Sequence, residues 1–118
     1  MIRAIATAAF LFVTTVVHAQ SLTLEPYYKV SGKNPNGTNY HGEIFLKRLS
    51  TTTFAVRWNI GPSTYTGFGM RMNNMLSATY TINGRPGLVI SEVQPDGSLN
   101  GLWAVRDVNG SGTELLTK

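Results

Sequence analysis

The strongest candidate for catalytic chemistry in this sequence is a histidine with a carboxylate nearby. His41 and Glu43 are two residues apart, so in an extended strand their side chains lie on the same face. Such a pair can act as a general base and the group that orients it. A nucleophile is also needed, and the sequence contains no Gly-x-Ser-x-Gly motif. We therefore expect His41 to be a solvated surface residue and the protein not to be an enzyme.

Metal and cofactor binding lack the residue types that they require. The sequence contains no cysteine, and its two histidines are His18 and His41. Its six acidic residues do not follow the spacing of a calcium-binding EF-hand loop. The glycines are not followed by a predicted helix, so none forms a strand-to-helix phosphate loop. The sequence predicts no metal site and no cofactor.

The aromatic residues suggest a site of another kind. Trp58 and Trp103 occupy inward positions of predicted strands, where they either fill the core or line an apolar ligand cavity in a calycin-like barrel. A barrel of about eight strands holds packed side chains and at most one small ligand, so both alternatives stay open and we favour the core. The residues assigned to the structural core are Tyr40, Gly42, Val56, Trp58, Gly67, Gly101 and Trp103.

The first 19 residues have the features of a secretory signal peptide. A short positive start, Met1-Ile2-Arg3, precedes an uncharged run over 4–17, and Val17-His18-Ala19 is a small-x-small cleavage site. The run is shorter than the roughly 20 residues that a membrane span needs, and no other segment could cross a bilayer as a helix. We expect export to the periplasm or the extracellular space, and a single domain over residues 20–118.

Charge argues against one class of partner, and cysteine content excludes one source of stability. Without Arg3, the chain keeps nine basic and six acidic residues, and only Lys47 and Arg48 are adjacent among the basic ones. A nucleic-acid surface would gather basic residues on one face with aromatic residues between them, so nucleic acid is not an expected partner. Because an exported chain without cysteine has no disulfides, its hydrophobic core must stabilise it.

Turn signals divide the chain into short segments typical of β-strands. Asn, Gly, Pro and Asp recur every ten to fourteen residues, and each favours a turn for a physical reason. Short connections predict antiparallel neighbours, and closing such a sheet on itself removes its exposed edges. We predict an all-β, up-and-down meander that closes into a small barrel, with a two-sheet sandwich as the alternative. The expected strands are 22–31, 40–48, 53–60, 64–72, 75–82, 87–93, 98–106 and 112–117.

Alternation within strands predicts which residues face inward. Over 53–60 the apolar set Phe54, Val56, Trp58 and Ile60 alternates with Ala55, Arg57 and Asn59, and over 40–48 Tyr40, Gly42, Ile44 and Leu46 form the equivalent set. The simplest registers place both Gly42 and Gly67 opposite Trp58, and Glu43 opposite Arg57. Polar outward residues such as Glu43, Lys47 and Arg57 argue against a membrane-spanning barrel.

The outward positions predict an apolar patch on the second to fourth strands. In the simplest registers Phe45 lies opposite Ala55, Ala55 opposite Met70, and Phe68 opposite Arg57. A connected apolar patch beside an arginine is typical of an interaction surface. These five residues are therefore the predicted partner-binding or self-association surface, which Met72 and Met75 could extend.

A pattern that spans nearly the whole mature chain resembles a group of small secreted bacterial proteins that are often labelled "fibronectin-binding protein". It consists of residues spaced two apart around glycines: Tyr28, Val30, Gly32, Asn34, Pro35 and Gly37; Tyr40, Gly42 and Ile44; Val56, Trp58, Ile60 and Gly61; Tyr65, Gly67 and Gly69; Asp96, Gly97, Leu99, Gly101 and Trp103; and Gly112, Thr113 and Glu114. The resemblance implies a non-catalytic exported protein that adheres to fibronectin or another host-matrix protein, and it transfers no binding residues. The alternatives are a lipocalin-like carrier of a small apolar ligand and a barrel-type inhibitor of a secreted protease.

Overall fold

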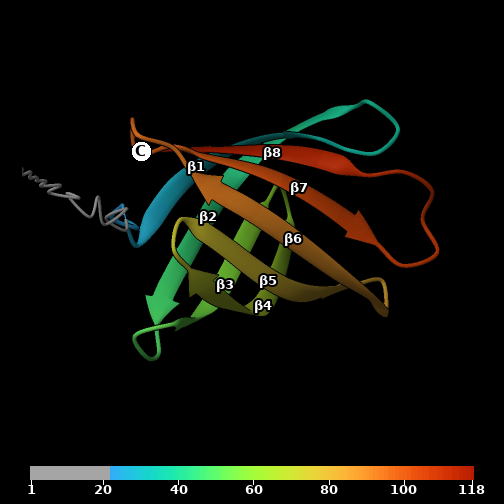
Figure 1. The fold of residues 1–118 in the computed structure, drawn as a ribbon. Coiled ribbons are helices and arrows are strands. Elements are labelled where there is room, and N and C mark those ends of the chain that lie inside the picture. The colour runs from blue at the N-terminus through green and yellow to red at the C-terminus, as the bar shows by residue number, and fades with distance from the viewer. Residues whose placement is uncertain (1–21) are drawn as a thin grey trace, which may run out of the picture.

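Eight antiparallel strands close into a barrel in the computed structural model, which describes residues 22–118 (Figure 1). Each strand pairs with the next along the chain, and β8 returns to pair with β1. The predicted all-β meander and closed barrel are confirmed, and the sandwich alternative is wrong. The strands are β1 (Tyr27–Lys33), β2 (Asn39–Arg48), β3 (Thr53–Ile60), β4 (Ser63–Met72), β5 (Met75–Ile82), β6 (Arg85–Val93), β7 (Leu99–Val105) and β8 (Gly112–Thr117).

The predicted signal peptide, residues 1–19, lies outside the described residues. Between residues 22 and 118, no helix is long and apolar enough to cross a membrane.

Turns between strands form where the sequence predicts them. The β4–β5 and β5–β6 turns place Asn73 and Asn83 at positive φ angles of 55° and 50°. Asparagine tolerates this left-handed conformation better than most residues, which explains its position in these two-residue connections.

The first strand starts five residues later than predicted. The sequence predicts a strand over 22–31, whereas β1 covers Tyr27–Lys33. Residues 22–26 instead run across one end of the barrel, where Leu22 donates its N–H to Asn74 Oδ1 at 2.8 Å and Arg71 donates to the Leu22 carbonyl. Leu22 and Leu24 also pack against the core. We call this the closed end of the barrel.

Inward faces agree with the alternation in the sequence. Phe54, Val56 and Trp58 are buried on β3, and Ile44 and Leu46 are buried on β2. The core also contains residues of β1 and of β5 to β8: Tyr28, Val30, Leu76, Ala78, Val89, Val93, Leu99 and Leu116.

The predicted registers of β2–β3 and β3–β4 are each wrong by two residues. Gly42 pairs with Ile60 and Trp58 pairs with Ile44 across β2–β3, whereas Gly67 pairs with Val56 across β3–β4. The cause lies in the connections. The β2–β3 loop is held by the N–H of Leu49, which donates to the Thr53 carbonyl, and the β3–β4 turn consists of Gly61 and Pro62 alone. A slip of two residues keeps every side chain on its face, so the assignment of inward residues is unaffected.

Candidate functional site in the barrel interior

The barrel is hollow at the end opposite residues 22–26, and we call this the open end. The β1–β2 and β7–β8 loops extend from it (Figure 1). A cavity of about 260 Å³ lies inside this end. Its lining residues come from seven of the eight strands and one loop: Asn34, Tyr40, Trp58, Ile60, Tyr65, Tyr80, Ile82, Val89, Trp103 and Glu114.

Aromatic rings paired with glycines form much of the cavity wall. In three cross-strand pairs a ring lies over a glycine of the neighbouring strand: Tyr40 over Gly32, Tyr80 over Gly87, and Trp103 over Gly112. A Cβ atom at any of these glycines would overlap the paired ring. The missing side chains therefore let the rings lie against the wall of the barrel and leave the middle of this end open.

The same rings contact one another around the cavity. The Tyr40 and Trp103 ring centroids are 6.1 Å apart with planes at 73°, and those of Trp58 and Tyr80 are 5.3 Å apart at 64°. Both arrangements are edge-to-face, which is favourable because the positive edge of one ring meets the negative face of the other. These contacts fix the rings relative to one another, so the shape of the cavity is largely pre-formed.

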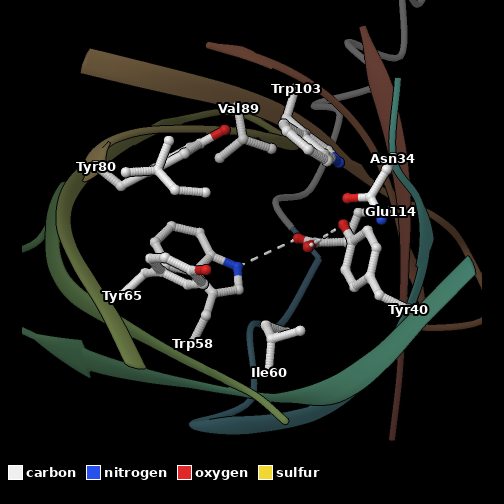
Figure 2. Close-up of a pocket in the computed structure, with 10 residues that line it drawn as sticks. Asn34, Tyr40, Trp58, Ile60, Tyr65, Tyr80, Val89, Trp103 and Glu114 are labelled. Carbon is white, nitrogen blue, oxygen red and sulfur yellow. Dashed lines mark hydrogen bonds between the residues drawn. The ribbon is translucent and has the colours of Figure 1, made fainter. Parts of the chain in front are cut away.

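A buried carboxyl group forms one side of the cavity. Glu114 on β8 is 7% exposed. Tyr40 donates its hydroxyl to Oε1 at 3.0 Å, and Trp58 donates its Nε1–H to Oε2 at 3.3 Å (Figure 2). Burial raises the pKa of the Glu114 carboxyl, and the two hydrogen bonds oppose this shift. Within the part of the chain that the structure describes, no lysine, arginine or histidine lines the cavity beside it.

The indole N–H of Trp103 is buried and makes no hydrogen bond of good geometry among residues 22–118. The Tyr40 hydroxyl is close enough for the indole N–H to lower its pKa slightly, against the larger effect of burial, but the two groups are not aligned as a regular hydrogen bond. In Figure 2 this nitrogen points to the side of the cavity where Tyr40, Asn34 and Glu114 place their polar atoms. A buried donor without an acceptor is costly, and most such donors in folded proteins are paired. The cavity thus has a polar side that contains an unsatisfied donor and a carboxyl group, and an aromatic side formed by Trp58, Tyr65 and Tyr80.

Two tyrosines of the cavity, Tyr40 and Tyr80, stay neutral at physiological pH. Burial raises the pKa of the Tyr40 hydroxyl well above its usual value near 10, and the charge of Glu114 adds to this effect. Burial and the same charge also raise the pKa of the Tyr80 hydroxyl. Of Tyr40, Tyr80 and Glu114, the carboxyl of Glu114 is therefore the group that ionises first as the pH rises.

The sequence identifies much of this cavity but not its polar group. Trp58 belongs to the buried core and also lines the cavity. Tyr40 and Trp103 are partly buried against the core and line the cavity as well. Core packing and cavity lining, the two alternatives from the sequence, therefore occur together. Of the other predicted core residues, Val56 is buried, and Gly42, Gly67 and Gly101 lie on inward positions of their strands. Sequence reasoning missed Glu114. The alternation Gly112, Glu114, Leu116 on β8 was the signal that could have found it, because it places the carboxyl on the inward face.

Gly67, which the sequence predicts to lie opposite Trp58, is a glycine for a different main reason. A Cβ at this position would lie 3.3 Å from Trp58 Cζ3. The more severe overlap, however, is with the backbone oxygen of Thr79 on β5. Gly67 is thus required mainly by the close approach of the neighbouring strand.

His41 and Glu43 lie outside the barrel, away from the cavity. His41 is exposed and pairs across the sheet with Ser31. Glu43 accepts hydrogen bonds from Tyr27 Oη at 3.2 Å and from Asn59 Nδ2 at 3.1 Å. The carboxylate is therefore bound to Tyr27 and Asn59 and does not orient the imidazole.

The predicted outer patch is continuous, but its pairing differs from the expected one. Ala55 lies opposite Phe68, Phe45 opposite Arg57, and Met70 opposite Thr53. Phe68 and Met70 are 52% and 56% exposed. The Arg57 guanidinium lies 4.5 Å from the centroid of the Phe45 ring and partly covers it. The three expected pairs are each displaced by two residues, for the reason given above for the turns.

A second group of exposed apolar residues was missed. Ile90 and Leu102 lie opposite each other on β6 and β7, with Leu88 and Leu115 nearby on the same outer face. Their alternation with the inward residues of the same strands could have identified them.

Comparison with known proteins supports the fold alone. No protein-family model matches the sequence, and no curated protein is similar enough to count as a relative. Among solved structures, the chain is similar to a redesigned β-barrel, mFAP1, bound to DFHBI, with a TM-score of 0.62 and 17% sequence identity. The match covers 80% of this chain and 94% of that protein. At this identity the similarity shows a shared barrel architecture.

Replacing Gly87 with alanine should close part of the cavity. The three atoms nearest to the new Cβ all belong to the Tyr80 side chain, none farther than 3.0 Å, so we expect the ring to move off the wall toward the cavity. We expect Gly87→Ala to keep the barrel and to lose about 1–3 kcal/mol of unfolding free energy, as for other overpacked sites. Nuclear Overhauser contacts between the Tyr80 and Trp58 rings would report the movement. Leu88→Ala, on the same strand but exposed, is the control, and unchanged ring contacts in Gly87→Ala would contradict the pairing.

The buried carboxyl should make stability fall as pH rises. Because the pKa of Glu114 is higher in the folded than in the unfolded state, the unfolded chain releases its proton first, near the usual value of 4.5, and is thereby favoured. The penalty grows until the pH passes the folded-state pKa. As the pH rises from the unfolded-state pKa of Glu114 to its folded-state pKa, we expect Glu114→Gln to become increasingly stable relative to the natural protein. Urea denaturation at a series of pH values measures this difference. Asp96, whose pKa is lowered by hydrogen bonds from Ser98, acts in the opposite direction in both proteins and cancels. A difference independent of pH would contradict the raised pKa.

Proposed function

We propose that this protein is a non-catalytic, exported binding protein that holds one small molecule at the open end of its barrel. The observation that carries the proposal is the unpaired indole N–H of Trp103, which lies beside a buried carboxyl group in an aromatic cavity. A barrel interior built only for packing would fill this space with apolar side chains, as the closed half does. A polar group that is left unsatisfied in a hollow site is a typical feature of a binding pocket.

The cavity sets simple requirements for its ligand. At about 260 Å³ it is slightly smaller than the pockets of about 300–1,000 Å³ that bind drug-sized molecules, so the ligand is small. The rings of Trp58, Tyr65 and Tyr80 favour a flat apolar body. The N–H of Trp103 requires a hydrogen-bond acceptor on the ligand. These properties describe a small aromatic or compact apolar molecule with one polar end.

Intrinsic fluorescence should report binding directly. The chain contains two tryptophans, and both line the cavity, so a ligand in the cavity must contact the fluorophores. We expect benzyl alcohol, which has a flat ring and a hydroxyl acceptor, to change the emission saturably. Gly87→Ala should weaken this effect strongly, because Tyr80 would occupy part of the space, and Leu88→Ala should bind as the natural protein does.

Native mass spectrometry of protein purified from its own host complements this titration. A bound small mass that is retained by Leu88→Ala and lost from Gly87→Ala would support the cavity as the site. Identical behaviour of the two variants in both measurements would contradict the proposal.

A second candidate function uses the outer surface, and the exposure of Phe68 and Met70 favours it. These side chains lie beside Ala55 and Arg57 on neighbouring strands and form a continuous apolar patch with a cationic edge. Methionine, aromatic residues and arginine are enriched in protein interfaces. This patch supports the expectation of a protein partner such as fibronectin, or of self-association.

Two substitutions on this patch separate the surface function from the cavity function. Phe68→Ser with Met70→Ser should leave the fold intact, because both side chains are more than half exposed. We expect this double variant to lose saturable capture by immobilised fibronectin while it still binds benzyl alcohol. Absence of fibronectin binding by the unmodified protein at about micromolar concentration, an ordinary range for transient partners, would remove this named partner.

A further inference from the structure

Among residues 22–118, the carboxyl group of Glu114 has two hydrogen-bond donors but no positively charged partner. Tyr40 and Trp58 are neutral donors, and each bonds one of the two carboxylate oxygens. A carboxylate has about four acceptor sites, so further donors can bind. Lys33, adjacent to the Gly32 that pairs with Glu114, is exposed, and its ammonium donates to Asn39 Oδ1 at 2.9 Å outside the barrel. Among residues 22–118 the ion pair found is between Arg106 and Asp107, on the surface.

Buried charges in proteins are normally paired, because an isolated ion in a medium of low polarity is costly. Glu114 can avoid this cost in two ways: it can bind a proton, or it can bind a cation that enters the cavity. The cavity is large enough for the second, and its volume lies next to the carboxyl group. The charge of Glu114 is therefore available to a ligand in a way that a paired carboxylate would not be.

The aromatic wall has the same electrostatic preference. The faces of Trp and Tyr rings carry partial negative charge, and a desolvated cation is attracted to them when it lies within about 6 Å of the ring centre. Trp58, Tyr80 and Tyr65 supply such rings opposite the polar side of the cavity (Figure 2). The carboxyl group and the rings thus act in the same direction, and both disfavour an anion.

We propose that the ligand of this cavity is a small organic cation, in which an ammonium group contacts Glu114 and the apolar body lies among the aromatic rings. This proposal rests on the proposed binding function and names its ligand class. An acceptor on the ligand, such as a hydroxyl or ether oxygen, would pair with the free N–H of Trp103. An amine with a hydroxyl group on a compact apolar body satisfies all three features.

Binding of a cation should depend on pH through Glu114. Among residues 22–118, the titratable side chains that line the cavity with Glu114 are Tyr40, Tyr65 and Tyr80. Burial raises the pKa of the Tyr40 and Tyr80 hydroxyls, so both stay neutral. A cation binds the ionised carboxylate, so binding below the pKa of Glu114 must release its proton. Affinity for a cation should therefore fall as the pH decreases through this pKa, by up to about tenfold per pH unit, and affinity for a neutral ligand should not.

Three probes of similar size separate these possibilities: benzylamine, benzyl alcohol and benzoate, each titrated by tryptophan emission and calorimetry. We expect benzylamine to bind at least about tenfold more tightly than benzyl alcohol, from the charge-assisted hydrogen bond and the ring contacts, and benzoate to bind weakest. In Glu114→Gln, which keeps the size and polarity of the side chain, this preference should disappear while benzyl alcohol still binds. Benzyl alcohol binding that is retained in this variant also shows that the barrel remains folded.

Each result decides between the two proposals. Equal affinities for benzylamine and benzyl alcohol, or a preference for the amine that survives in Glu114→Gln, would overturn the cation proposal and leave the binding function standing. If neither probe binds at about 10 mM, well beyond the weakest useful affinities, the cation proposal fails; if native mass spectrometry also finds no bound mass, the binding function fails with it.

Discussion

Each of three glycines in the barrel wall lies opposite an aromatic ring, and the shape of the open end depends on these pairs. A ring that packed against an ordinary side chain would stand away from the sheet and fill the interior. Over a glycine it can lie close to the backbone, and the close contacts at Gly32, Gly87 and Gly112 show that no larger residue fits without a shift. Glycine is otherwise unfavourable in strands, because it has no side chain to pack and loses more conformational entropy on folding than other residues do. Glycine therefore recurs at the open end because it lets the rings lie against the wall and leaves space for the cavity.

The two ends of the barrel interior differ in how they are covered and in which side chains they contain. At the closed end, residues 22–26 cross the opening, and Leu22 and Leu24 cover a continuous apolar core. Arg71 and Asn74 fix this segment through hydrogen bonds to the backbone of Leu22. At the open end, a carboxyl group and an indole N–H remain inside an aromatic wall. The apolar core is thus covered at the closed end, and the polar groups of the interior lie at the open end.

Turn signals and short connections predicted the strands and the barrel, and alternation predicted the inward faces, because a period of two residues survives errors in strand pairing. Alternation could not fix the registers, since these depend on how each turn is built: Gly61 and Pro62 form a two-residue connection, and the β2–β3 loop is longer. The same limit applied to the site. Trp58 and Trp103 were expected to face inward, but whether they pack together or around a hollow depends on which residues lie across from them. Alternation on β8 places Glu114 on the inward face, but only the closed barrel brings its carboxyl beside Tyr40 and Trp58.

The central claim is that a ligand in the cavity pairs with the unsatisfied N–H of Trp103. A proton–nitrogen correlation spectrum tests it directly, because the two tryptophans give two indole signals, which Trp103→Phe would assign. On addition of benzyl alcohol, the Trp103 signal should move downfield as the N–H gains the hydroxyl oxygen as an acceptor. Protonated benzylamine carries no acceptor, so it should move mainly the Trp58 signal, through the bond from Trp58 to Glu114. A ligand that binds saturably while both indole signals stay unchanged would place the site elsewhere on the protein.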